Sequence, residues 1–111
     1  MSYYDIKEIP PGKPAEGVEI RVIAGDKMTM VFFRLEPGAE IPEHSHPHEQ
    51  MGTVLKGSLE LIIDKDRKVV TAGDAYHVRS NILHSGRCLE TVSEVLEVFS
   101  PPREDYIQQK P

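Results

Sequence analysis

The sequence predicts an all-β fold in which short antiparallel strands close into a single small barrel or jelly roll. Nine Pro and eight Gly lie scattered between short apolar or β-branched runs in the 111 residues, a pattern typical of strands joined by tight turns. No window carries the longer apolar stripe at helical period that an amphipathic helix needs. Closing such strands into one sheet would remove exposed edges and leave a mouth for one small ligand.

The strands are expected where apolar residues alternate with polar ones or form short continuous runs. Turns at Gly25-Asp26-Lys27 and Lys56-Gly57 each predict a hairpin between the runs on either side. We expect strands at residues 18–24, 29–35, 50–55, 58–63, 69–71, 75–78 and 94–99. Residues 64–68 are expected to form a charged turn, and the tail after Pro102 either a short helix or a segment packed along the outside.

Length, charge and cysteine content restrict the classes of function. The length predicts one domain over residues 1–111. The net charge of −5 argues against a general nucleic-acid binder, which needs a basic surface. A single cysteine, Cys88, excludes an internal disulfide. No segment has the apolar length of a transmembrane helix, and the N-terminus lacks a signal-peptide core. We therefore expect a cytoplasmic protein that acts on a small molecule, not on nucleic acid or a membrane.

A cluster of histidines is the strongest chemical signal. His44 and His46 lie two residues apart, so in an extended segment both imidazoles point to the same side. Gln50 adds an amide oxygen, and His84 comes from a later strand or turn, while His48 follows Pro47 and is expected at the rim. The set suits one divalent ion such as Ni, Zn, Fe or Mn. The alternative is a solvated histidine cluster in a surface loop.

Such a ligand set would carry no charge of its own. A bound ion would keep its full positive charge and act as a strong Lewis acid. Because imidazole binds metal only when neutral, we expect affinity to weaken as the pH falls through about 6.5.

The residues around these histidines resemble the two motifs of the cupin superfamily. The first motif spaces a glycine, a His-x-His pair, a glutamate and a second glycine, and the matching residues are Gly38, His44, His46, Gln50 and Gly57. In the second motif only Gly73 and His84 match by identity, because Arg79, Asn81 and Cys88 stand where the family has proline, glycine and asparagine. The motifs span residues 38–88, and a C-terminal strand and tail occupy 92–111. The resemblance implies a cupin-type barrel.

A narrower resemblance links two strings, residues 44–50 and 99–105, to the pectin-degradation cupins. Those small proteins linearise cyclic 4,5-unsaturated uronates. The resemblance implies a metal held by His44, His46, Gln50 and His84. It also implies an acid two residues before a phenylalanine on the last strand and an arginine four residues after it, which are Glu97, Phe99 and Arg103 here. The family acid is an aspartate, so Glu97 is longer by one methylene group.

These residues have definite expected roles. Strand alternation puts Glu97 on the same face as Phe99, so we expect it to point inward and to act as general acid and base. Arg103 follows two prolines and would grip a carboxylate, while Phe99 would form a wall for the sugar ring. Tyr76 and Arg34 are further substrate-binding candidates. The structural alternatives are a solvent-facing position or an ion pair for Glu97, a surface or interface position for Arg103 and a plain core role for Phe99.

The leading hypothesis is therefore metal-assisted ring opening and tautomerisation of an unsaturated uronate to a linear keto-uronate. A metal-dependent dioxygenase is a second hypothesis, although Gln50 lacks the negative charge that would stabilise an oxidised metal. A cupin that binds a small molecule without turnover is the third. The resemblance also implies a homodimer formed by sheet augmentation, for which the apolar segments 18–23 and 28–33 are candidates.

Overall fold

The computed structural model describes residues 2–107; Met1 and residues 108–111, the end of the expected tail, lie outside the described part. The chain forms ten strands, a 3-10 helix η1 (Ile6–Glu8) and a four-residue helix α1 (Glu104–Ile107). The strands are β1 (Gly12–Ala15), β2 (Val18–Ala24), β3 (Thr29–Leu35), β4 (Glu40–His44), β5 (Glu49–Lys56), β6 (Ser58–Ile63), β7 (Asp66–Thr71), β8 (Ala75–Val78), β9 (His84–Cys88) and β10 (Ser93–Ser100).

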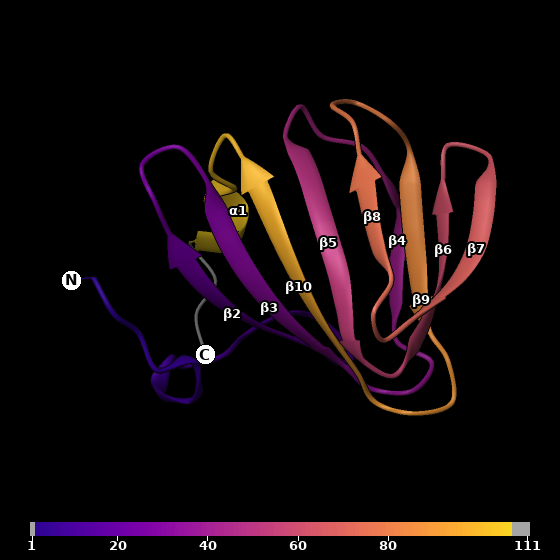
Figure 1. Cartoon of the computed structure of the whole chain (residues 1–111), viewed down its shortest axis with the longest axis horizontal. Coiled ribbons are helices and arrows are strands. Elements are labelled where there is room, and N and C mark those ends of the chain that lie inside the picture. The colour runs from indigo at the N-terminus through magenta and orange to yellow at the C-terminus, as the bar shows by residue number, and fades with distance from the viewer. Residues whose placement is uncertain (1, 108–111) are drawn as a thin grey trace.

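The strands form two antiparallel sheets; in Figure 1 strands β2, β3, β10 and β5 of one lie on the left, and β9, β6 and β7 of the other lie on the right. One sheet has the order β1-β2-β3-β10-β5-β8 and the other the order β4-β9-β6-β7. The predicted all-β antiparallel fold is confirmed, but the expected closed barrel is not, because the two sheets remain separate as a β-sandwich. The edge strands β1 and β4 contain Pro14 and Pro42, and proline has no N–H with which to extend a ladder.

The expected strands are found, and three strands were missed. β2, β3, β6 and β8 have the expected bounds, whereas β7 begins at Asp66, inside the stretch expected to be a charged turn. The missed strands β1, β4 and β9 are polar or contain proline, so they carry no apolar alternation. After Pro102 the chain forms the short helix α1. Among the described residues no helix is long and apolar enough to cross a membrane.

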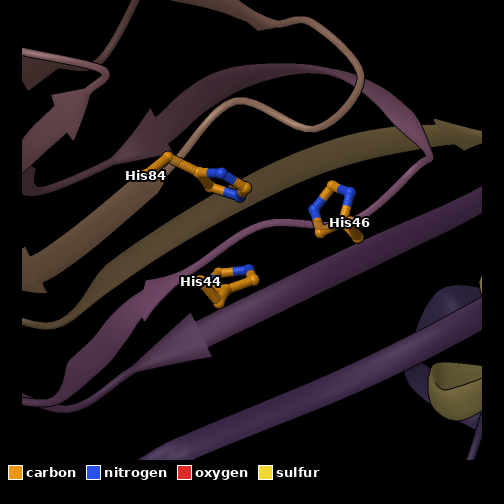
Figure 2. A group of neighbouring side chains, drawn as sticks. All are labelled: His44, His46 and His84. Atoms are coloured by element: carbon orange, nitrogen blue, oxygen red, sulfur yellow. The ribbon is translucent and has the colours of Figure 1, made fainter.

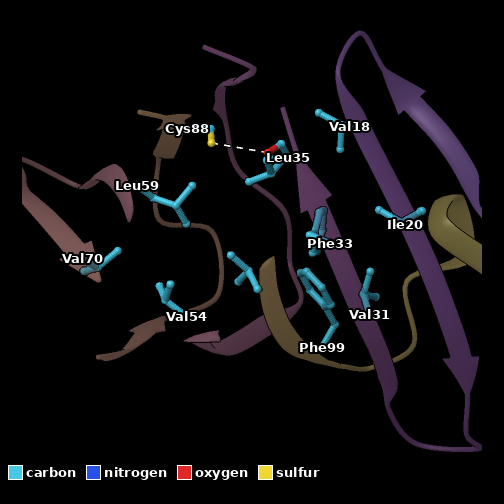
Figure 3. Packing of buried hydrophobic residues seen from close by; sticks show 11 residues of the cluster. Val18, Ile20, Val31, Phe33, Leu35, Val54, Leu59, Val70, Cys88 and Phe99 are labelled. Carbon is cyan, nitrogen blue, oxygen red and sulfur yellow. Dashed lines mark hydrogen bonds between the residues drawn. The ribbon is translucent and has the colours of Figure 1, made fainter. Parts of the chain in front are cut away.

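The core lies between the sheets and follows from strict alternation in the central strands. Val31, Phe33 and Leu35 of β3 and Val95 and Phe99 of β10 are buried, and they pack with residues of the facing sheet (Figure 3). Burying each such side chain stabilises the fold by about 1.5–3 kcal/mol. The same alternation places Glu97 among the inward-facing residues of β10.

Cys88 is part of this core and makes local hydrogen bonds. Its side chain is fully buried, and its thiol lies 3.1 Å from the carbonyl oxygen of Thr91 and 3.2 Å from Oγ of Ser93. Cys88 therefore acts as a small core residue that links β9 to the start of β10.

Gly57 joins β5 to β6 in a conformation that other residues avoid. Its φ is +81°, and a Cβ at this position would lie 2.5 Å from Oγ of Ser93 and 2.6 Å from the carbonyl oxygen of Val92. Gly57→Ala is therefore expected to lower the free energy of unfolding by about 1–3 kcal/mol, measured by urea unfolding of the metal-free protein.

Gly73→Ala is the matched control for that measurement. Gly73 also has a positive φ, +96°, but a Cβ there would meet no described atom within 4 Å. Its replacement tests the backbone conformation without the overlap, so a smaller loss of stability is expected. Equal losses in the two variants would contradict a contribution from the crowding around Gly57.

Candidate metal centre and pocket

Three histidines, two of them close in the sequence and one from a later strand, meet between the sheets. His44 ends β4, His84 begins β9, and His46 lies in the segment that leads to β5 (Figure 2). Their potential ligand nitrogens all lie within 4.8 Å of one another. Nitrogens bonded to one ion at about 2.1 Å are at most about 4.2 Å apart, so small rotations of the rings would bring all three to a common ion. The three histidines are positioned to bind a metal.

The backbone around the cluster explains this convergence. His44 is directly opposite His84 in the β4–β9 ladder, and the register shifts between Ile41 and His44. Such a bulge changes the direction of the side chains that follow it. Asn81 stands where the family motif has glycine, and it adopts the left-handed conformation with φ +66°, which asparagine tolerates better than most residues. Its backbone N–H donates to the carbonyl oxygen of His46 at 2.8 Å, so the loop before His84 also holds His46.

Each of the three imidazoles is oriented by a hydrogen bond from Nδ1 to a backbone carbonyl. The acceptors, in chain order, are the carbonyl oxygens of Pro42, His48 and Ile82, at 2.8, 2.9 and 2.8 Å. Because a carbonyl only accepts, each Nδ1 carries a proton, so in the neutral ring Nε2 is the nitrogen that presents a lone pair. His48 thus supports His46 through its backbone.

The donor atoms fit a divalent ion. Nε2 of His46, Nε2 of His84 and Oε1 of Gln50 are buried and find no hydrogen-bond partner among residues 2–107. Burial, with the nearby Arg103 charge, lowers the pKa of His46 to about 4, and burial also lowers the pKa of His84. Both rings are therefore neutral at pH 7. The expected weakening of metal binding near pH 6.5 moves to lower pH for these two ligands.

A buried carboxylate lies beside this cluster. Glu97 accepts a hydrogen bond at Oε2 from the hydroxyl of Tyr76 at 2.5 Å and a second from Nε2 of Gln50 at 2.8 Å. Burial raises the pKa of Glu97, although both hydrogen bonds and the Arg103 charge act in the opposite direction. Burial and the neighbouring carboxylate raise the pKa of Tyr76, so its hydroxyl stays a donor. A carboxyl group in this state can exchange a proton with a ligand.

Arg103 lies close enough to His46 and Glu97 for its charge to act on both, and one edge of its guanidinium is already paired. Nε and Nη2 donate to the carboxylate of Asp105 at 2.9 and 2.6 Å. The guanidinium stacks on Phe99 and Tyr106, at 4.9 and 4.0 Å from the ring centroids, a favourable arrangement for a cation. Nη1 is buried and has no partner among the described residues. A ligand anion is the natural partner for this nitrogen.

One pocket collects most of the residues expected at the site. Its polar end is formed by His44, Gln50, Tyr76, His84, Glu97 and Arg103, and Phe99 lines it as well. His46 reaches the same region by packing edge-on against Phe99, with 5.8 Å between ring centroids. The rest of the lining is mostly apolar, including Leu61 and Ile63. Few polar groups are therefore available to fix a ligand, and most of them gather around the histidines.

The structure does not bring Arg34 to this pocket. Phe33 and Leu35 point into the core, so Arg34 between them lies on the outer face of β3. There its side chain is 43% exposed and pairs with Glu36 at 2.7 Å. The outward position of Arg34 could have been predicted from the alternation of β3, because the residues next to an inward-facing residue of a strand point outward.

Two residues that complete the site were missed from the sequence. Asp105 holds Arg103, and its position two residues further on was a signal for a local ion pair. Gly52 lies in β5 under the ring of Tyr76, where an added Cβ would come within 2.5 Å of that ring. Nothing in the sequence pairs Gly52 with Tyr76, since that contact depends on the register between β5 and β8.

Comparisons with known proteins agree with this geometry. Residues 31–99 match the family model of the cupin domain. The pectin degradation protein KdgF of Dickeya dadantii (strain 3937) is 31% identical over 107 residues, or 95% of this chain and 97% of that protein. The structure of KdgF from Halomonas sp. matches with a TM-score of 0.89 at 25% identity, over 95% of this chain and 97% of that chain. A RmlC-like cupin from Shewanella frigidimarina NCIMB 400 matches with a TM-score of 0.90 at 26% identity, over 96% of each chain.

These matches cover more than the motif region. The family model includes the strands from β3 to β10, and the relative from Dickeya dadantii aligns along nearly the whole length of both proteins. From its two-sheet fold, its clustered histidines and these matches, the chain belongs to the cupin family.

Proposed function

We propose that the protein converts a cyclic 4,5-unsaturated uronate into a linear keto-uronate, with one divalent ion held by His44, His46, Gln50 and His84. The observation that carries this proposal is the polar end of a single pocket, where a neutral metal-ligand set, a buried carboxyl group and a partly free guanidinium meet. The name of the relative from Dickeya dadantii, a pectin degradation protein, supports a sugar acid as the substrate class.

Each residue at the polar end of the pocket has a separate role in the proposed reaction. A bound divalent ion would supply Lewis acidity at a substrate oxygen. Nη1 of Arg103 binds the uronate carboxylate, and the ring of Phe99 packs against the sugar. Glu97 takes the proton of the anomeric hydroxyl as the bond between the anomeric carbon and the ring oxygen breaks. The bond electrons leave on the ring oxygen as an enolate, which takes a proton at C4 from the now protonated Glu97 and becomes the ketone, so Glu97 is regenerated and the product is an isomer of the substrate.

The direct test follows the double bond of the substrate. Purified protein loaded with Ni, Zn, Fe or Mn is mixed with an unsaturated uronate, and the loss of the ultraviolet absorbance of the double bond is recorded. Protein from which a chelator has removed the metal is the control. We expect rapid loss with at least one metal and a linear keto-uronate by NMR. A rate equal to that of buffer with every metal would rule the reaction out. Saturable binding without turnover would favour the cupin that only binds its ligand.

Arg103→Lys tests the role of the guanidinium. Lysine keeps the positive charge but has a single nitrogen. It cannot pair with Asp105 through two nitrogens and at the same time present a third to the pocket, as the planar guanidinium of Arg103 does. We expect KM for the uronate to rise about tenfold or more, the effect of losing one charge-assisted hydrogen bond of about 1.5 kcal/mol, with a smaller change in kcat.

Arg34→Lys is the matched control for that measurement. Arg34 lies on the outer face of β3, paired with Glu36, so the same chemical change should leave both kinetic constants unaltered. If KM rose equally in the two variants, or in neither, Arg103 would not be the residue that binds the carboxylate.

We also propose that the protein is a homodimer in the cytoplasm. The expected segments 18–23 and 28–33 belong to β2 and β3, which are already paired on both sides and cannot extend a partner's sheet. The outer face of the six-stranded sheet supports an interface instead, because Met51 and Leu55 of β5 are 58% and 51% exposed there. Exposed apolar side chains on one sheet face are a common feature of interaction surfaces. Light scattering should give twice the mass of the chain, and a monomeric mass would contradict the dimer.

A further inference from the structure

Glu97, Gly52 and Tyr76 form one row across three neighbouring strands. Glu97 of β10 is directly opposite Gly52 of β5, and Gly52 is directly opposite Tyr76 of β8. Neighbouring strands are about 4.8 Å apart, so the backbones of Glu97 and Tyr76 are separated by about 10 Å. Two side chains can meet across this distance only if the residue between them leaves the space free.

Gly52 provides that space. A Cβ at this position would lie 2.5 Å from Cζ and 2.6 Å from the hydroxyl oxygen of Tyr76, so the ring of Tyr76 lies directly over the glycine backbone. From there the Tyr76 hydroxyl reaches Oε2 of Glu97 at 2.5 Å. Any larger residue at position 52 would displace the ring and separate these two groups.

The length of Glu97 completes the connection. An aspartate would place its carboxylate about 1.5 Å further back, one carbon–carbon bond short of its present position. Oε2 of Glu97 also accepts from Nε2 of Gln50 at 2.8 Å. This hydrogen bond fixes the nitrogen end of the Gln50 amide and leaves its oxygen, Oε1, without a partner among the described residues. Gln50 lines the same pocket as His44 and His84, and Oε1 is buried there.

We propose that Tyr76, lying over Gly52, is a positioning residue that holds the carboxylate of Glu97 and, through Glu97, turns the amide oxygen of Gln50 toward the metal ligands. The kinetic consequence rests on the proposed function, whereas the consequence for metal binding does not depend on the substrate. The glutamate at position 97 is then matched to its two partners, and Gly52 and Tyr76 explain how the longer acid is accommodated.

The test compares Tyr76→Phe with Gly52→Ala in the full-length protein. The first variant removes only the hydroxyl, and the second displaces the ring while leaving Tyr76, Glu97 and every proposed ligand in place. Tyr3→Phe is the control, because Tyr3 is 88% exposed near the N-terminus. Affinity for Co²⁺ and the visible absorption of the bound ion are measured first, since the absorption reports the ligand geometry, and thermal unfolding verifies that each variant is folded.

Both variants are expected to weaken Co²⁺ binding about tenfold and to alter its absorption, because residues behind a metal ligand typically contribute 10–100-fold in affinity. If the uronate is turned over, kcat should fall about 10–100-fold, KM should change less than threefold, and the double variant should resemble the single ones, since both changes remove the same contact. Wild-type Co²⁺ affinity and absorption in Tyr76→Phe would overturn the positioning role. Absence of turnover in the wild type would overturn only the proposed reaction, and the Co²⁺ measurement would still decide this inference.

Discussion

His84→Ala is expected to abolish tight binding of a divalent metal. Nε2 of His84 is buried and unpaired within the described chain, and its ring centroid lies 4.2 Å from that of His44 and 4.9 Å from that of His46. Residues that only support a ligand contribute about 10–100-fold to metal affinity. Loss of a direct ligand should therefore weaken binding by more than about a hundredfold, and any metal-dependent turnover should disappear with it.

Calorimetric titration with Zn²⁺, Ni²⁺ and Mn²⁺ measures this loss and also ranks the metals. His77→Ala is the matched control, because His77 is exposed and its Nε2 pairs with Glu49 at 2.6 Å on the outer surface. That variant should bind metal as the wild type does. Unchanged affinity in His84→Ala would show that the histidines converge for another reason, and every proposal that depends on the ion would fail with it.

The sequence predicted the parts of the fold that are built from local patterns. β2, β3, β6 and β8 follow from apolar alternation and from the glycine turns between them. β4 and β9 were missed because each has one inward apolar residue, Ile41 or Cys88, and a metal-ligand candidate in place of a second one: His44 ends β4 and His84 begins β9. The same replacement that builds the site therefore removes the pattern by which a strand is recognised.

The site could be predicted only as far as local spacing and family motifs extend. His44 and His46 follow from their separation by two residues, but His84 was joined to them by a family motif, since its pairing opposite His44 is a tertiary contact. Arg34 was expected at the site, but it alternates with the inward-facing residues of β3 and therefore points outward. The contact between Gly52 and Tyr76 depends on strand register, which no local pattern in β5 or β8 specifies.

Glu97→Gln should lower kcat on the unsaturated uronate by about 10²–10⁴-fold, the usual contribution of a general acid or base. Glutamine keeps the length and shape of the side chain, and its carbonyl oxygen can still accept from Tyr76 and Gln50. Metal affinity should therefore stay within about tenfold of the wild type, below the effect of losing a ligand. Full activity in this variant would remove Glu97 from the chemistry and leave proton transfer to water or another group.

The stability of the same variant gives an independent measure of the cost of burying this acid. Burial raises the pKa of Glu97, so between its ordinary pKa and the raised value the folded protein binds more protons than the unfolded chain. Stability contributed by the protonated form is then lost as the pH rises through that window. Glu97→Gln has no such proton to lose, so the metal-free variant should gain thermal stability relative to the wild type as the pH increases. A constant difference across pH would mean that Glu97 is ionised in the fold throughout, held by Tyr76 and Gln50 as a permanent carboxylate. In that case Glu97 would be a base from the start, which is the form in which it takes the proton of the anomeric hydroxyl.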